Sequence, residues 1–235
     1  MRNIGATLTE DLLSVLFPPL CPCCGATMVR GEKPLCLSCR MKLPLTGHEK
    51  SPTSNDLINK LQGIIAFERA AAYFTYRREA PQARLLHDMK YHSRPEIGRQ
   101  LAAEYSRTLL AAGFFDSIDA VAPVPLNFWR HCRRGYNQSA HIAAGAASAP
   151  GLPVIDALRA RRHSSQTRLS ATGRLEALKG IFSARPDSLR GINHLLLVDD
   201  ICTTGATLYA CAEALRAVRP DLRISAFVLA STSLL

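Results

Sequence analysis

Residues 194–208, with the sequence HLLLVDDICTTGATL, hold the densest group of side chains that could do chemistry. Apolar residues run into two adjacent acids, Asp199 and Asp200, and a loop of threonine and glycine follows at once. In open α/β sheets, ligands bind at the carboxyl ends of the strands, which is where these acids are expected. The loop offers hydroxyl groups, successive backbone N–H groups and the start of a helix, and these groups together suit a phosphate.

The chemistry of this segment excludes some ligands and favours others. No lysine follows Gly205, so the loop is not of the G-x-x-x-x-G-K-[ST] type. The paired carboxylates repel phosphate but suit ribose hydroxyls or a hydrated Mg²⁺. A simpler alternative is that Asp200 and Thr204 only cap the following helix, although a single acid would be enough for that role.

A second group of reactive residues lies near the N-terminus, where five of the eight cysteines fall between positions 21 and 39. Cys21 and Cys24 form one C-x-x-C pair, and Cys36 and Cys39 form another. Two such pairs can surround one tetrahedral Zn²⁺, and four protein ligands leave no open position for catalysis. A disulfide pair or unrelated buried thiols are the alternatives, and Cys23 could replace Cys24 as a ligand. We therefore expect a structural zinc ribbon.

Most of the excess positive charge belongs to the larger predicted domain, residues 61–235. The protein carries 29 Lys and Arg against 19 Asp and Glu, a formal net charge of +10. Residues 130–174 hold eight arginines and a single acid, Asp156. Arginine forks suit diphosphate oxygens, but they also suit a nucleic-acid backbone or a solvated charged face.

The pattern of apolar residues predicts the elements that position these groups. Strands alternating with helices indicate a mainly parallel sheet covered on both faces. The strands are expected at 64–76, 120–124, 154–155, 195–198 and 224–230, and the helices at 81–91, 95–112, 137–147 and 207–218. A polar linker is expected at 44–62 and a loop at 160–176. The domains predicted are an N-terminal segment, 1–60, with ribbon and linker, and a larger domain, 61–235.

Hydropathy bears on the location of the protein. No apolar stretch approaches the roughly 20 residues that cross a bilayer. The early apolar run 12–20 is interrupted by Pro18 and Pro19 and follows two acids, unlike a secretory signal. We expect a soluble cytoplasmic protein with no membrane insertion.

Four sequence blocks resemble the ComF-type family, which joins a zinc ribbon to a type I phosphoribosyltransferase domain and is associated with natural competence. The blocks are CPCCG…CLSC, KYHSRPEIGRQLA (90–102), VAPVPLNFWRHCRRGYNQSAHIA (121–143) and QTRLSATGRLEALKGIF (166–182). Residues 194–208 themselves resemble that enzyme class's phosphoribosyl-diphosphate loop. The resemblance implies an α/β fold with a type I phosphoribosyltransferase-like parallel sheet flanked by helices, and a small N-terminal zinc ribbon with four cysteine ligands.

The same resemblance implies roles for individual residues. Asp199 and Asp200 would bind the ribose 2′- and 3′-hydroxyls at the catalytic centre. The 5′-phosphate would be held by Thr203, Thr204, Gly205, Ala206 and Thr207. The remaining ligand-binding residues implied are Lys90, Arg130, Arg133, Arg134, Asn137 and Gln138 on the diphosphate and acceptor side, and Gln166 and Arg174 in a hood over the site.

Two functions follow from these expectations. The first is binding of Mg–phosphoribosyl diphosphate, with transfer to an unidentified acceptor as the reaction if the protein is an enzyme. The alternative is a single-stranded DNA-binding accessory protein of DNA uptake, with a non-catalytic nucleotide site and competence proteins as partners.

Overall fold

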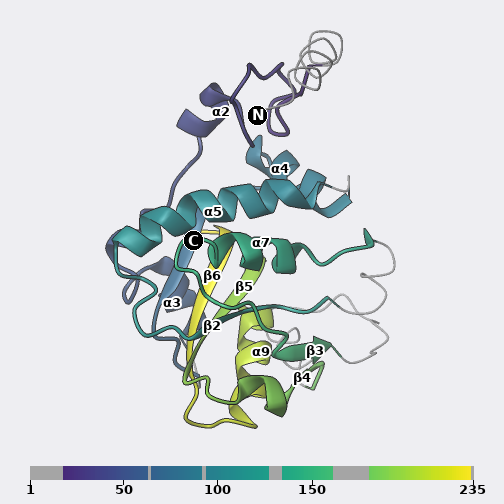
Figure 1. Cartoon of the computed structure of the whole chain (residues 1–235). Coiled ribbons are helices and arrows are strands. Elements are labelled where there is room, and N and C mark those ends of the chain that lie inside the picture. Colours follow the sequence, from purple (N-terminus) through teal and green to yellow (C-terminus); the bar gives the residue numbers. More distant parts are fainter. Residues whose placement is uncertain (1–17, 63–64, 92–93, 127–133, 161–179, 234–235) are drawn as a thin grey trace, which may run out of the picture.

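A parallel β-sheet forms the centre of the molecule in the computed structural model, which describes residues 18–62, 65–91, 94–126, 134–160 and 180–233 (Figure 1). In sheet order the strands are β1 (Ala70–Thr75), β6 (Arg223–Ser231), β5 (His194–Cys202) and β2 (Ala120–Pro123). All three neighbouring pairs are parallel. The two central strands, β5 and β6, are almost continuously buried, as expected for parallel strands covered on both faces.

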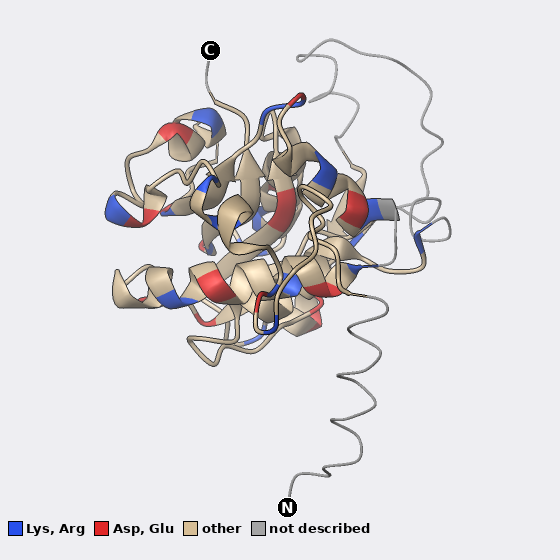
Figure 2. Cartoon of the chain, turned by 90° about the horizontal axis from the view of Figure 1, so that it is seen from above, with Lys and Arg blue, Asp and Glu red and all other residues tan. Residues whose placement is uncertain are grey.

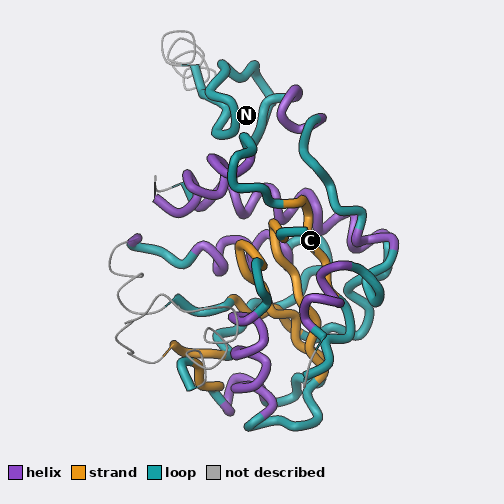
Figure 3. Tube along the Cα trace, turned by 180° about the vertical axis from the view of Figure 1, so that it is seen from behind, coloured by secondary structure: helices purple, strands orange, loops and turns teal. Residues whose placement is uncertain are grey.

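Helices cover the two faces of this sheet, as the view from behind also shows (Figure 3). They are α3 (Asp56–Leu61), α4 (Gln82–Tyr91), α5 (Pro95–Ala111), α7 (Gln138–Ala146) and α9 (Ala206–Arg216). Leu196 and Val198 of β5 pack in the apolar cluster that contains α4, α5 and α7. Their neighbours Leu195 and Leu197 pack in the cluster that contains α3 and α9. The predicted parallel sheet flanked by helices is therefore confirmed.

The helix α7 packs closely on α5 near its carboxyl end and is attached to the sheet at its start. At Gly145 of α7, an added Cβ would lie 2.2 Å from the carbonyl oxygen of Arg99 in α5. Only glycine permits that approach. Asn137 caps the start of α7 through a bond from Ser139 N, and its amide donates to Val124 O at 3.0 Å, just beyond β2.

The segment predicted as a linker contains a 3-10 helix, η1 (His48–Lys50), and α3, which packs on the sheet. Asn55 caps α3 by accepting from the backbone N–H groups of Leu57 and Ile58, both at 3.0 Å. The Asn55 amide also donates to the carbonyl of Ala70 at the start of β1, at 2.9 Å. One side chain thus both starts the helix and attaches it to the sheet.

Smaller elements complete the described fold. An antiparallel pair, β3 (Leu158–Ala160) and β4 (Phe182–Ala184), lies outside the main sheet and is followed by η2 (Pro186–Leu189). The short strand expected at 154–155 is a single bridge from Val154 to Val121. The loop expected at 160–176 lies, apart from its first residue, outside the described residues. No helix in the described ranges is long and apolar enough to cross a membrane.

The N-terminal ribbon rests on α5. It includes α2 (Leu37–Met41), which stands beyond α4 and α5 in Figure 1. Arg40 of α2 forms an ion pair with Glu104 of α5 at 3.0 Å, and Tyr73 of β1 donates to the same carboxylate at 3.2 Å.

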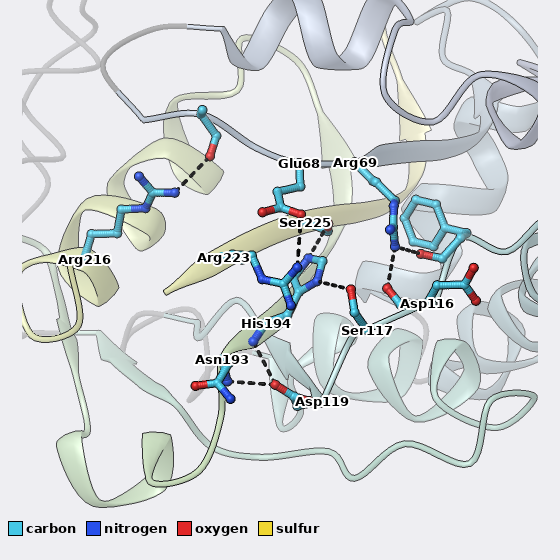
Figure 4. Close-up of polar contacts among 12 residues, drawn as sticks. Glu68, Arg69, Asp116, Ser117, Asp119, Asn193, His194, Arg216, Arg223 and Ser225 are labelled. Carbon is cyan, nitrogen blue, oxygen red and sulfur yellow. Dashed lines mark hydrogen bonds and ion pairs between the residues drawn. The ribbon is translucent and has the colours of Figure 1, made fainter. Parts of the chain in front are cut away.

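A polar network closes the amino end of the sheet (Figure 4). His194, which is fully buried at the start of β5, bonds Ser225 Oγ through Nε2 at 2.9 Å and Ser117 Oγ through Nδ1 at 3.3 Å. The carboxylate of Asp119 accepts from the backbone N–H groups of Asn193 and His194, at 2.7 and 2.9 Å. The strands β2, β5 and β6 are therefore joined at this end by side chains as well as by the backbone ladder.

Candidate functional site

The carboxyl end of β5 carries the two acids singled out in the sequence. Asp199 is half-buried, and Asp200 is 8% exposed. The Oδ1 atom of Asp199 accepts from Ser139 Oγ of α7 at 2.9 Å and from the backbone N–H of Asp200 at 2.8 Å. The acids thus lie where the sheet end meets the first turn of α7.

The environment of Asp199 disfavours its charge. Burial and the neighbouring carboxylate of Asp200 raise the pKa of Asp199 from 3.8 to about 7. The hydrogen bonds from Asp200 N and Ser139 and the charge of Lys90 act in the opposite direction but do not cancel the increase. Near neutral pH, the carboxyl group of Asp199 is therefore partly protonated, and it can either donate or accept a hydrogen bond.

Lys90, at the end of α4, lies at this pair of acids. Its Nζ is 3.0 Å from Oδ2 of Asp200. Next to it, the Met89 carbonyl accepts a 2.5 Å hydrogen bond from the hydroxyl of Tyr136, which lies shortly before α7. The structure thus brings together α4, the entry to α7 and the end of β5, which are far apart in the sequence.

The loop after β5 leads directly into α9. Thr203 and Thr204 are exposed, and Gly205 is the N-cap of α9 with φ +79°, a conformation that favours glycine. A Cβ on Gly205 would lie 2.9 Å from Leu61 Cδ2 and 3.4 Å from the carbonyl oxygen of Lys60. Ala206 N donates to Thr204 Oγ1 at 3.4 Å, while Gly205 provides no side-chain cap. Of the two residues considered as caps of this helix, Thr204 thus bonds its first turn, whereas the carboxylate of Asp200 pairs with Lys90.

Apart from Arg134, whose guanidinium bonds Gln138, the other predicted ligand residues divide into two groups. Asn137 and Gln138 lie at the start of α7, but their side chains are used or enclosed there: Asn137 caps the helix, and Gln138 is only 2% exposed. The Oε1 atom of Gln138 accepts from Arg134 at 3.1 Å, and its Nε2 has no hydrogen-bond partner within the described ranges. Arg130, Arg133, Gln166 and Arg174 lie outside the described residues.

Three residues at this end of the sheet are absent from the sequence-based set. Ser139 holds Asp199, and Lys60 and Thr232 lie against the loop 203–207. Ser139 falls within the block 121–143, next to predicted residues, so its position was a usable clue. Lys60 and Thr232 follow no motif, and they are 172 residues apart in the chain.

The four predicted cysteines meet in one cluster. The Sγ atoms of Cys21, Cys24, Cys36 and Cys39 all lie within 4.8 Å of one another. A tetrahedral zinc with Zn–S bonds of about 2.3 Å needs sulfur–sulfur separations of about 3.8 Å. The Cys24 and Cys36 sulfurs are 3.8 Å apart, so the donor set fits zinc. Cys23 does not belong to this group of four.

Local backbone geometry builds the cysteine cluster. The first pair lies in a turn in which Gly25 N donates to Cys21 O and Cys21 N donates to Ala26 O, both at 2.8 Å. In the second pair, Cys36 caps α2, and its Sγ accepts from Cys39 N at 3.5 Å. Each C-x-x-C pair therefore presents both sulfurs on one side of a tight turn.

Charges of both signs are interspersed over the described helices and loops (Figure 2). Lys90 pairs with one of the acids at the end of β5, while six of the eight arginines at 130–174 lie in residues that the structure does not describe.

Comparison with known proteins identifies the ribbon. The family model of the double zinc ribbon domain matches residues 12–50, which include all four cysteines of the cluster. Among solved structures, glutamine phosphoribosylpyrophosphate amidotransferase from B. subtilis is similar with a TM-score of 0.39 and 18% identity. That match covers 61% of this chain and 30% of the other, so the chain spans less than a third of that enzyme.

Curated relatives match the chain over most of its length. The DNA utilization protein YhgH of Salmonella typhi is 30% identical over 201 residues, which are 83% of each protein. The competence protein ComFC of Bacillus subtilis (strain 168) is 26% identical over 215 residues, 86% of each. Competence protein F of Haemophilus influenzae is 35% identical over 101 residues, 42% of this chain and 44% of that protein. With a zinc ribbon, a parallel sheet and this identity along the chain, the protein belongs to the ComF-type family.

Proposed function

We propose that the carboxyl end of the sheet binds phosphoribosyl diphosphate as its magnesium complex. The observation that carries this proposal is the placement of Asp199 and Asp200 at the end of β5, joined without a break to a loop that opens α9 at Gly205. Adjacent carboxylates suit a pair of ribose hydroxyls. Loop N–H groups at a helix start suit a phosphate ester.

The residues at the site have separable roles in this proposal. Asp199, with a pKa of about 7, can donate to one ribose oxygen or accept from a hydroxyl, while Ser139 keeps its carboxyl in place. Asp200 exchanges its contact with Lys90 for the second hydroxyl, which frees the Lys90 ammonium for the diphosphate. Carboxylate oxygens are ligands that magnesium accepts, and a bound ion would offset the charge of the diphosphate.

A transfer reaction would follow if an acceptor binds beside the sugar. The bond from C1 to diphosphate breaks, the acceptor forms a new bond at C1, and diphosphate leaves with the bonding electrons. The work of the protein would be orientation and charge stabilisation, with Arg130, Arg133 and Arg134 on the side of the leaving diphosphate.

Calorimetric titration of Mg–phosphoribosyl diphosphate tests the proposal. We expect micromolar binding by the wild type and loss of binding in the double variant Asp199→Asn/Asp200→Asn. The matched control is Asp187→Asn/Asp221→Asn, which removes the same charge from two exposed acids whose side chains are 87% and 69% exposed. Equal binding by wild type and the first variant, or no binding by folded wild type, would contradict the proposal. If the wild type binds and the first variant does not, diphosphate release in the presence of candidate acceptors would test turnover.

We also propose binding of single-stranded DNA as a second function, with competence proteins as partners. It is supported by relatives named as competence and DNA utilization proteins and by the net charge of +10. Fluorescence anisotropy with a labelled oligonucleotide should show affinity falling about tenfold or more between about 50 and 200 mM salt. Affinity that does not change with salt would exclude a backbone-binding mode. Competition by Mg–phosphoribosyl diphosphate would show whether the two ligands share one site.

A further inference from the structure

Lys60 and Thr232 lie directly behind the loop 203–207, on a side that no motif of the sequence indicates. Lys60 is at the end of α3, and Thr232 is the residue after β6. Lys60 Nζ donates to Thr232 Oγ1 at 2.9 Å, to Ser231 Oγ at 3.2 Å and to the carbonyl of Thr232. An ammonium group has three protons, and these three acceptors use them all. Lys60 is therefore engaged within the protein and is not placed to contact a ligand directly.

Thr232 in turn binds two successive carbonyl groups, those of the last residue of β5 and the first residue of the loop. Its backbone N–H donates to Cys202 O at 3.1 Å, and its Oγ1 donates to Thr203 O at 3.1 Å. In a regular strand, the carbonyl groups of successive residues point to opposite sides. The carbonyls of Cys202 and Thr203 both point toward Thr232, so the regular strand geometry ends between them. The hydroxyl of Thr232 is at the same time the acceptor of the Lys60 bond, which polarises it as a donor.

The direction of these carbonyls sets the direction of the N–H groups. In a trans peptide, the N–H of the next residue points opposite to the carbonyl. The one cis peptide bond in the described ranges is at Lys33–Pro34, so both loop peptides are trans. The N–H groups of Thr203 and Thr204 consequently point away from Thr232. Both residues are exposed, so an anion can reach this part of the loop.

The packing of Gly205 on α3, which does not depend on these hydrogen bonds, also places the end of α3 against the loop. The positive-φ residue Gly205 packs so closely on α3 that an added Cβ would meet Leu61 and the carbonyl of Lys60. Asn55 holds α3 on β1 at its other end. The loop is thus supported from one side by α3 and from the other by the end of β6.

We infer that Lys60 and Thr232 are positioning residues of the phosphate loop, which hold the peptides after Cys202 and Thr203 so that their N–H groups face a phosphate. The inference rests on the proposed function. The inference adds a basic residue to that function, because the loop itself contains no lysine. The Lys60 ammonium does not contact the phosphate but bonds the Thr232 hydroxyl, which in turn bonds the loop. The ligand class is a phosphate monoester such as the 5′-phosphate of a ribose.

Four single variants test this arrangement, with ribose 5-phosphate and Mg–phosphoribosyl diphosphate as the probes in calorimetry. Lys60→Met and Thr232→Val should each weaken binding of both probes by about tenfold. The first removes the bonds that hold Thr232 in place, and the second removes the bond from the Thr232 hydroxyl to the carbonyl of Thr203. Thr232→Ser keeps the hydroxyl and should bind within about twofold of wild type. Lys50→Met, at an exposed lysine at the end of η1, is the control for loss of one positive charge.

Hydrogen exchange gives a readout that does not depend on affinity. In Thr232→Val, the amides of Thr203 and Thr204 should exchange differently from wild type, while those in the centre of β5 should not. If Lys60→Met does not fold, the comparison of Thr232→Val with Thr232→Ser decides. Wild-type affinity in Thr232→Val, or equal losses in Thr232→Val and Thr232→Ser, would overturn the inference and leave the proposed function intact. No binding by the wild type would instead remove the proposed function, and the inference with it.

Discussion

The polar groups at the two ends of the strand β5 differ in how well their partners satisfy them. At the amino end, His194 and Asp119 are surrounded by partners that satisfy them: two serine hydroxyls for the imidazole and two backbone N–H groups for the carboxylate. At the carboxyl end, two carboxylates lie next to each other, and the pKa of one is raised to about 7. The amino end stabilises the fold, whereas the carboxyl end keeps an unfavourable arrangement that a ligand or cation could relieve.

The pKa values of the aspartates at the two ends of the sheet are shifted in opposite directions. The backbone N–H groups of Asn193 and His194 lower the pKa of Asp119, so the fold favours its charged form. Burial and Asp200 raise the pKa of Asp199, so the fold favours its neutral form. Two aspartates at opposite ends of one sheet should therefore respond with opposite signs to the loss of their charge.

The largest expected effect comes from breaking the network at the amino end. His194→Ala removes a fully buried ring and leaves Ser117 and Ser225 without their shared partner. We expect the free energy of unfolding to fall by about 3 kcal/mol, from the lost packing and the unsatisfied hydroxyls. Chemical denaturation at pH 7.5 measures it, and a loss under about 1 kcal/mol would contradict a stabilising role for this network.

A matched pair of isosteric substitutions tests the contrast itself. Asp119→Asn should lower the free energy of unfolding by about 1 kcal/mol, because a charged acceptor of two N–H groups becomes neutral. Asp199→Asn should raise it at pH 8 by about 1–2 kcal/mol, because repulsion by Asp200 and the cost of burying the charge disappear. Equal signs for the two variants in the same denaturation assay would contradict the comparison.

The gain from Asp199→Asn should depend on pH. The folded-state pKa of Asp199 is raised to about 7 from 3.8, so its contribution to stability is full below about pH 3.8 and is lost as the pH rises through about 7. The difference in unfolding free energy between Asp199→Asn and wild type should therefore be largest at pH 8 and small near pH 4. Thermal melts over this range check it, and a constant difference would mean that Asp199 does not titrate between these limits.

The pH response of the amino end has the opposite sign. Burial lowers the pKa of His194 below 6.5, so its contribution to stability is present above about pH 6.5 and is lost as the pH falls. In His194→Asn, melting temperatures between pH 7 and pH 5 should decline less than in the wild type. If the melting temperatures of the two proteins fall equally, protonation of His194 is not the cause of the loss of stability in acid.

An effect as small as that of Asp119→Asn is expected at the ion pair of Lys90 and Asp200. Lys90→Met should lower the free energy of unfolding at pH 8 by about 1 kcal/mol, because both acids then lack their nearest cation. The loss should shrink in the Asp199→Asn background, since only one charged acid remains there. A double-mutant cycle measures this coupling, and strictly additive effects would mean that Lys90 does not act on Asp199.

Much of the site was predictable because its chemistry is local in the chain. The acids and the loop of residues 203–207 are contiguous, and the apolar run before them indicates a buried strand, so their place at a sheet end follows from strand–loop–helix order. The C-x-x-C spacing likewise predicts the metal cluster, because each pair brings two sulfurs to one tight turn. The alternation of strand and helix patterns predicted the parallel sheet, and the structure confirms it.

The support of the loop was not predictable, because it depends on contacts between segments that are distant in sequence. Residues 44–62 have the polar composition of a linker, yet α3 forms there because Asn55 caps it and bonds the start of β1. Lys60 consequently meets Thr232, and no periodicity or motif links two residues so far apart. Gln138, predicted as a ligand residue, is enclosed by packing at the start of α7, which composition does not reveal.

The order of residues along the chain was thus sufficient to predict which chemical groups each site contains. These groups are four cysteine thiols in two pairs, two adjacent acids, and a threonine–glycine loop before a helix. The tertiary structure decided their environment. It placed Asp199 against Asp200 and Ser139, Lys90 beside Asp200, and Lys60 behind the loop. The physical reason is that covalent spacing determines which groups are neighbours along the chain, whereas burial, charge proximity and hydrogen-bond partners depend on which elements pack together.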